Sequence, residues 1–190
     1  SISPRYRRLL FEIFRFGWPE RSLSDAELVH LEGLTQLQSL SLNDTGIHGA
    51  GLVHIKGLAK LQTLDLDNTP VRDAGLVHLK GLTNLQTLKL SGWATDAGLL
   101  HLKPLTKLQT LVLRHSQVTD AGLVHLKGLT GLQELVLSGS ITDAGLVHLK
   151  GLANLQGLDL QTGKITDAGL VHLHGMTKLQ HLHLNLTQIT

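Results

Sequence analysis

The chain has 190 residues, no cysteine and a formal charge of +2, and 45 of its residues are leucine. This length suffices for one domain or one repeat array with a sizeable core. The absence of cysteine excludes disulfides, thiolate metal ligands and a thiol nucleophile, and it favours a cytoplasmic location over an oxidising compartment. No apolar run reaches the roughly 20 residues of a membrane span. Residues 1–21 hold five arginines and two glutamates, a charge of +3, so residues 22–190 carry −1 and lack the basic face that nucleic acid requires.

The first segment differs from the rest of the chain, because residues 1–21 contain five of the six aromatic residues. Its apolar positions follow the i, i+3, i+4, i+7, i+8 spacing of an amphipathic helix: Tyr6, Leu9, Leu10, Ile13 and Phe14. We expect residues 1–22 to form a helix that caps the open end of a repeat array spanning 23–190. A basic helix on a membrane surface and a helix that docks a partner are the alternatives. Glu12 and Arg15 interrupt the early apolar stretch and argue against a secretory signal.

From residue 23 onward the chain repeats itself every 23 or 24 residues. One histidine marks each unit: His30, His54, His78, His101, His125, His148 and His172. A leucine block of the form LxxLxL begins in each unit at Leu37, Leu61, Leu85, Leu108, Leu132, Leu155 and Leu179. The two series interlock without a gap, which indicates seven structural repeats.

Each unit predicts one strand and one short helix. In residues 85–90, Leu88 and Leu90 alternate with polar residues, as in a strand with one buried face. In residues 119–128, Thr119 or Asp120 can cap a helix and Gly128 can end it. The units must stack to bury their leucines, because no single unit could do so alone.

The pattern LxxLxLxxTxITDAGLxxLxxL, seen between Leu155 and Leu173, resembles the leucine-rich repeat, and in particular the TDAGL-bearing subtype of bacterial and F-box-type proteins. The resemblance covers about residues 23–190. It implies an α/β fold, a curved right-handed solenoid with parallel strands on the concave side and short helices on the convex side. It also implies protein binding as the commonest role. After the strands, Thr45, Thr69, Ser116, Ser140 and Thr187 offer hydroxyls that could satisfy buried backbone groups, whereas Gly163 would interrupt such a ladder.

Three columns of residues are expected to point outward from the concave sheet. They are Ser39, Thr63, Thr87, Thr110, Glu134, Gly157 and His181; then Ser41, Asp65, Lys89, Val112, Val136, Asp159 and His183; then Asn43, Asp67, Ser91, Arg114, Ser138, Gln161 and Asn185. These positions vary between units, whereas the helices are nearly copies of one another. Drift on a solvated surface would also produce such variation. The columns contain no aromatic residue and one arginine, although interface hot spots favour both; Trp93 could contribute from the edge.

The sequence therefore predicts a protein-binding or scaffolding module that recognises its partner on the concave sheet. The candidate partner-binding residues are Asp65, Lys89, Val112, Arg114, Glu134, Val136, Asp159, His181 and His183. A structural segment of a larger protein, without a ligand of its own, is the alternative. Enzyme motifs are absent, so we expect no catalytic activity and no cofactor.

Histidines suggest two further readings. Asp159, His181 and His183 lie on neighbouring strands and are a plausible transition-metal set. The histidine column lacks neighbours at ligand spacing, so copying of one ancestral unit explains it.

Finally, the last unit stops at Thr190 without a following helix. Its open edge predicts either a longer array or an end-to-end homodimer.

Overall fold

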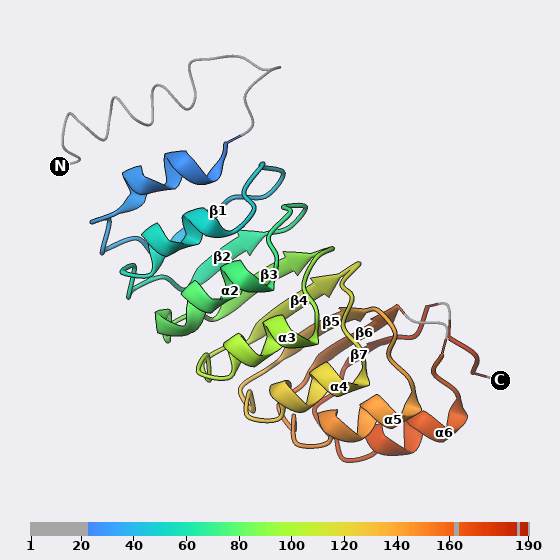
Figure 1. The fold of residues 1–190 in the computed structure, drawn as a ribbon. Coiled ribbons are helices and arrows are strands. Elements are labelled where there is room, and N and C mark those ends of the chain that lie inside the picture. The colour runs from blue at the N-terminus through green and yellow to red at the C-terminus, as the bar shows by residue number, and fades with distance from the viewer. Residues whose placement is uncertain (1–22, 162–163, 186, 190) are drawn as a thin grey trace.

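The computed structural model describes residues 23–161, 164–185 and 187–189, and the predicted capping helix 1–22 lies outside them. The described residues form one parallel sheet of seven strands in chain order (Figure 1). The strands are β1 (Ser39–Ser41), β2 (Thr63–Leu66), β3 (Thr87–Ser91), β4 (Thr110–Arg114), β5 (Glu134–Ser138), β6 (Gly157–Gln161) and β7 (His181–His183). Each strand pairs with the next repeat's strand, which confirms an α/β solenoid of seven repeats.

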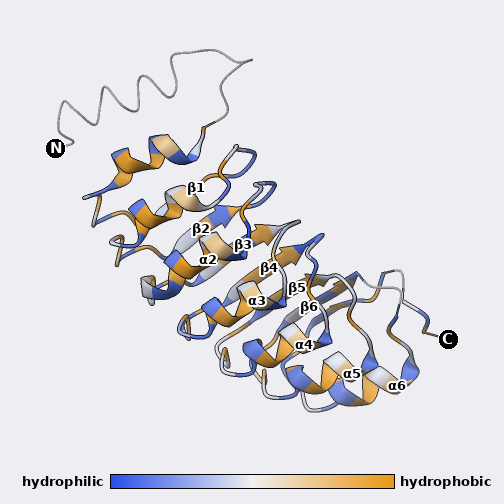
Figure 2. Ribbon diagram, in the orientation of Figure 1, coloured by the Kyte–Doolittle hydropathy of each residue, from blue (hydrophilic) through white to orange (hydrophobic). Residues whose placement is uncertain are grey.

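Short helices form a second layer that covers one face of the sheet and becomes the convex side (Figure 1). The α-helices are α2 (Asp73–Leu76), α3 (Asp96–Leu99), α4 (Asp120–Leu123), α5 (Asp143–Leu146) and α6 (Asp167–Leu170). The 3₁₀ helices are η1 (Asp25–Leu31), η2 (Ala50–Ile55), η3 (Val77–Gly81), η4 (Leu100–Leu102), η5 (Val124–Leu126), η6 (Val147–Leu149) and η7 (Val171–Leu173). Figure 2 shows hydrophobic and hydrophilic segments side by side on the labelled helices, as expected of a layer with one buried face.

The helical segment of each repeat differs from the single helix expected over 119–128. One α-turn, α4, is followed by the 3₁₀ turn η5, and the chain leaves through further i→i+3 bonds such as Leu129 N–H to Leu126 O at 2.9 Å. The reason is the spacing of the buried leucines, which are fully inaccessible at Leu123, Leu126, Leu129 and Leu132. A 3₁₀ helix has three residues per turn, so this spacing keeps all four on the core side. Gly128 lies in the following turn rather than ending a helix.

Consecutive repeats are joined by a side-chain ladder at the start of each helix. The Thr119 N–H and hydroxyl donate to the two carboxylate oxygens of Asp96 at 2.8 and 2.6 Å. The same hydroxyl caps α4 by accepting from Ala121 N–H at 3.3 Å, as predicted for this threonine. A Cβ added to Gly122 would collide with the Asp96 carboxylate. The same threonine–aspartate pairing recurs in three other junctions, so the TDAG sequence is explained by the stacking of repeats.

The expected hydroxyl ladder after the strands forms only in part. Thr69 is buried and donates to Leu66 O at 2.6 Å, and Ser116 is buried and donates to Ser138 O at 2.8 Å. Ser140 is exposed, so it does not continue the ladder. Gly163 lies outside the described residues.

Candidate functional site on the concave sheet

The strand register aligns the first two columns of outward residues as the sequence predicts. Glu134 pairs with Gly157 and then His181, and one step along the face Val136 pairs with Asp159 and then His183. Parallel strands lie about 4.8 Å apart, so residues in register are close neighbours. The columns therefore bring residues from separate repeats onto one continuous surface.

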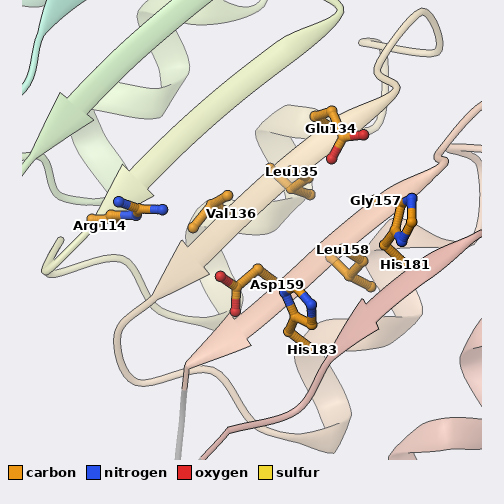
Figure 3. Close-up of a pocket in the computed structure, with 9 residues that line it drawn as sticks. All are labelled: Arg114, Glu134, Leu135, Val136, Gly157, Leu158, Asp159, His181 and His183. Atoms are coloured by element: carbon orange, nitrogen blue, oxygen red, sulfur yellow. The ribbon is translucent and has the colours of Figure 1, made fainter.

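A pocket of about 300 Å³ lies on this surface over β4 to β7 (Figure 3). Six of the nine candidate residues line it, namely Arg114, Glu134, Val136, Asp159, His181 and His183. Leu135, Gly157 and Leu158 complete the lining. The pocket thus combines an aliphatic wall with two carboxylates, one guanidinium and two imidazoles.

Gly157 shapes the pocket and was not among the candidates. A Cβ at this position would collide with the Glu134 carboxylate, so the absence of a side chain lets that carboxylate lie over β6. A glycine inside a strand marks the close approach of another group. A glycine at an outward position of a strand was visible in the sequence and would have identified Gly157 as a candidate.

Asp159 carries an unsatisfied hydrogen-bond acceptor. Its Oδ2 accepts from the Gln161 side-chain amide at 3.0 Å. Its Oδ1 is buried and has no hydrogen-bond partner within the described residues. Most buried polar atoms in proteins have a partner, so an exception of this kind calls for an explanation.

The remaining three candidates do not line this pocket. Lys89 Nζ lies 2.8 Å from Asp65 Oδ2, and Asp65 Oδ1 also accepts from Asp67 N–H at 3.0 Å. The charges of Asp65 and Lys89 therefore compensate each other within the chain. Val112 pairs with Val136 in register and extends the aliphatic part of the surface beside the pocket.

The third column is less solvated than expected. Ser138 is buried, and its hydroxyl accepts from His115 N–H at 2.7 Å. His115 has a φ of +53°, so the serine fixes a left-handed turn in the preceding repeat.

At the edge of the sheet, the Arg72 guanidinium lies 4.8 Å from the centroid of the Trp93 ring, which is 44% exposed. Trp93 is thus held in a cation–π contact.

The structure does not bring Asp159, His181 and His183 together as a metal-binding group. Within the described residues, no group of three histidine, aspartate or glutamate side chains is arranged to hold a metal ion. Residues that share a sheet face need not converge, because their side chains stand roughly perpendicular to the sheet. In Figure 3, Asp159 and His183 lie in one row of the pocket, whereas His181 lies in the row of Gly157.

The histidine column lies on the convex side, away from the pocket. The Nδ1 atoms of His101, His125, His148 and His172 are buried without a hydrogen-bond partner in the part of the chain that the structure describes. Burial lowers the pKa of His101, and Lys80 lowers it further, whereas Asp73 acts in the opposite direction. Burial, followed by Lys103, likewise lowers the pKa of His125, and Asp96 opposes this.

Sequence reasoning also missed a row of exposed aliphatic residues along the convex side. The row contains Val29, Val77, Leu100, Val124, Val147 and Val171, each between 38% and 53% exposed. The sequence shows this row as one aliphatic residue directly before the histidine of each repeat. Within the described residues, no helix has the length and apolar character needed to cross a bilayer.

Sequence and structure comparisons relate this repeat architecture to known proteins. Residues 105–126 match a family model described as Leucine Rich repeat, and the stacked strand–helix units extend the same arrangement over the described chain. The described residues thus fold as a leucine-rich-repeat solenoid. No curated protein matches it significantly in sequence.

Among solved structures, this leucine-rich-repeat array is similar to internalin C2 of Listeria monocytogenes. The two share 28% identity over 90% of this chain and 70% of that chain, with a TM-score of 0.74. An internalin of the same organism (inlF) is 18% identical over 85% of this chain and 58% of that chain, with a TM-score of 0.49. Leucine-rich-repeat folds commonly serve as scaffolds for protein interaction and typically lack catalytic activity.

Proposed function

We propose that this chain is a protein-binding module that recognises its partner on the concave sheet, chiefly over β4 to β7. The observation that supports this most is that the pocket is lined by outward residues that differ from one repeat to the next. Positions that stack the repeats are copied along the chain, as Asp96, Asp120 and Asp143 are. Glu134, Gly157 and His181 occupy one register row, yet they share no chemistry.

The composition of the surface also supports this proposal. Protein interfaces combine a more apolar centre with a polar rim. Val112 and Val136 supply the apolar part, and Arg114, Glu134 and Asp159 stand around it. Asp65 and Lys89 would contact the partner as an ion pair rather than as separate charges.

Several finer expectations belong to this proposal. The repeats are assigned to the TDAGL-bearing subtype of bacterial and F-box-type proteins, on the support of the threonine–aspartate ladder. The concave face acts by binding and not by catalysis, with a protein rather than nucleic acid as its ligand. The end-to-end homodimer stays a prediction.

The test is a selection of peptides from a random displayed library on the immobilised chain. Binding of the selected peptides is then measured for a concave triple variant, Arg114→Ala with Glu134→Ala and His181→Ala. The matched control is a convex triple variant of exposed lysines, Lys103→Ala with Lys127→Ala and Lys150→Ala. The proposal requires at least tenfold weaker binding by the concave variant and unchanged binding by the control. Loss confined to the convex variant would place the binding surface on the helices.

A further inference from the structure

The unpaired oxygen of Asp159 points to the chemistry of the ligand. Asp159 and Asp65 occupy the same outward column, on β6 and β2. At Asp65, the lysine of the following strand supplies an ammonium to Oδ2 at 2.8 Å, and a backbone N–H satisfies Oδ1. The molecule therefore contains a direct example of what a carboxylate in this column binds.

At Asp159, no lysine or arginine among the described residues supplies such a cation. The following strand presents His183 in register, and no hydrogen bond joins it to Asp159. The Gln161 side-chain amide donates to Oδ2 and leaves Oδ1 without a partner within the described residues. A carboxylate oxygen has two lone pairs, so Oδ2 can accept from a donor in the pocket while it keeps its hydrogen bond from Gln161.

The charge of the pocket favours a cation as that donor. Glu134 lies over Gly157 on the same face, one register row from Asp159. Two carboxylates face the single guanidinium of Arg114 in the lining of the pocket. Val136 offers an aliphatic wall, which suits the methylene stem that lysine and arginine place against apolar surface.

We propose that this pocket binds a lysine or arginine side chain of the partner protein, with its cationic group on Asp159 and with Glu134 adding negative charge in the adjacent row. This assignment rests on the proposed function, because the cation is carried by the protein that the concave sheet recognises. It goes further by naming the side-chain class that the pocket selects.

The experiment titrates the isotopically labelled chain with three small probes and follows backbone amide signals by NMR. The probes are N-acetyl-arginine amide, N-acetyl-lysine amide and the uncharged N-acetyl-citrulline amide. The two cationic probes should shift the signals of Gly157, Asp159 and His181 saturably, and the citrulline probe should bind at least tenfold more weakly. Asp159→Asn should weaken the cationic probes at least tenfold, whereas the charge-matched control Glu32→Gln, at an exposed carboxylate outside the pocket, should bind them as the native chain does.

Stability measurements check the unpaired oxygen independently. Asp65→Asn should lower the unfolding midpoint, because it breaks an ion pair, and Asp159→Asn should leave the midpoint unchanged or raise it. If His183→Ala lowers the midpoint as much as Lys89→Ala does, His183 already fills the role of the cation and the proposal is wrong. Equal binding of all three probes, or of the native and Asp159→Asn chains, would also overturn it. Peptides that still depend on the concave face in that case would leave the proposed function intact, so the two failures are distinguishable.

Discussion

At four junctions between repeats, the aspartate carboxylate of one repeat and a glycine of the next share the same small space. The Asp96 carboxylate rests where a Cβ of Gly122 would be, and it accepts two hydrogen bonds from Thr119. These three residue types are therefore fixed by packing and hydrogen bonding. Their repetition along the chain carries no information about a ligand.

Two glycines of one repeat provide a matched test of this packing. Gly122→Ala should lower the free energy of unfolding by about 1–3 kcal/mol, as overpacking of a filled site does. Gly128→Ala should be neutral or stabilising by up to about 1 kcal/mol, because nothing lies within 4 Å of its added Cβ and its φ is not positive. Denaturant unfolding of both variants measures the difference. Equal destabilisation by both changes would show that the Asp96 contact is not what requires glycine.

The same ladder predicts the acid sensitivity of Asp143. Hydrogen bonds from the Thr166 side chain and backbone lower the pKa of this carboxyl below its ordinary value of 3.8. A lowered carboxyl pKa stabilises the folded chain above the ordinary value, and this stabilisation is lost as the pH falls through the folded-state pKa. Thr166→Val should raise the pKa of Asp143, measured by NMR titration of its carboxyl carbon. An unchanged pKa would mean that the hydroxyl is not its principal cause.

At the scale of the element, the convex helices place His101 and His125 each close to a lysine of the preceding repeat. Lys80 lowers the pKa of His101 and Lys103 lowers that of His125, in both cases after burial. Lys80→Met should therefore raise the pKa of His101 without changing that of His125, and Lys103→Met should do the reverse. NMR titration of the ring protons measures both in one sample. A shift of both histidines in either variant would contradict this pairwise arrangement.

The sign of the resulting pH dependence follows from the lowered pKa values. Folding favours the neutral imidazole at these positions, so the unfolded chain binds more protons in the window below 6.5. The free energy of unfolding should therefore decrease as the pH falls from 6.5 toward the folded-state values. Denaturant unfolding in buffers on both sides of that window checks this.

Element type was predictable from the sequence only to the level of one strand and one helix per repeat. Leu123, Leu126 and Leu129 are three residues apart, and an α-helix of 3.6 residues per turn would rotate them off a common face. That spacing was visible, and it favours the observed 3₁₀ turns. Thr119 and Asp120 were both candidate caps, and the structure shows that Thr119 is the cap of α4.

At the scale of the whole molecule, stability is built from contacts between neighbouring repeats. Leu111 is fully buried between adjacent repeats, whereas Leu182 on β7 is 38% exposed. Leu111→Ala should lower the free energy of unfolding by about 2–5 kcal/mol, and Leu182→Ala should lower it much less. Denaturant unfolding compares the two. Similar losses would indicate that the array unfolds without a shared central core.

The register of the whole sheet was predictable because repeat length fixes which residues are neighbours. Asp159 and His183 were placed together for this reason, and so were Asp65 and Lys89. What the register could not predict is the direction of each side chain. Lys89 turns to Asp65, the Glu134 carboxylate lies over Gly157, and Asp159, His181 and His183 do not form a metal site. Both carboxylate oxygens of Asp65 have partners and Oδ1 of Asp159 has none within the described residues, a difference that only atomic positions show.

Photocross-linking from the two faces of the solenoid tests the central claim most directly. The photoreactive residue benzoylphenylalanine replaces Val112, beside the pocket, in one sample and Val124, exposed on the convex side, in the other. Each sample is mixed with a peptide selected for binding to the native chain and is then irradiated. Recognition by the concave sheet predicts a covalent product from position 112 and none above background from position 124. A product formed only from position 124 would contradict it.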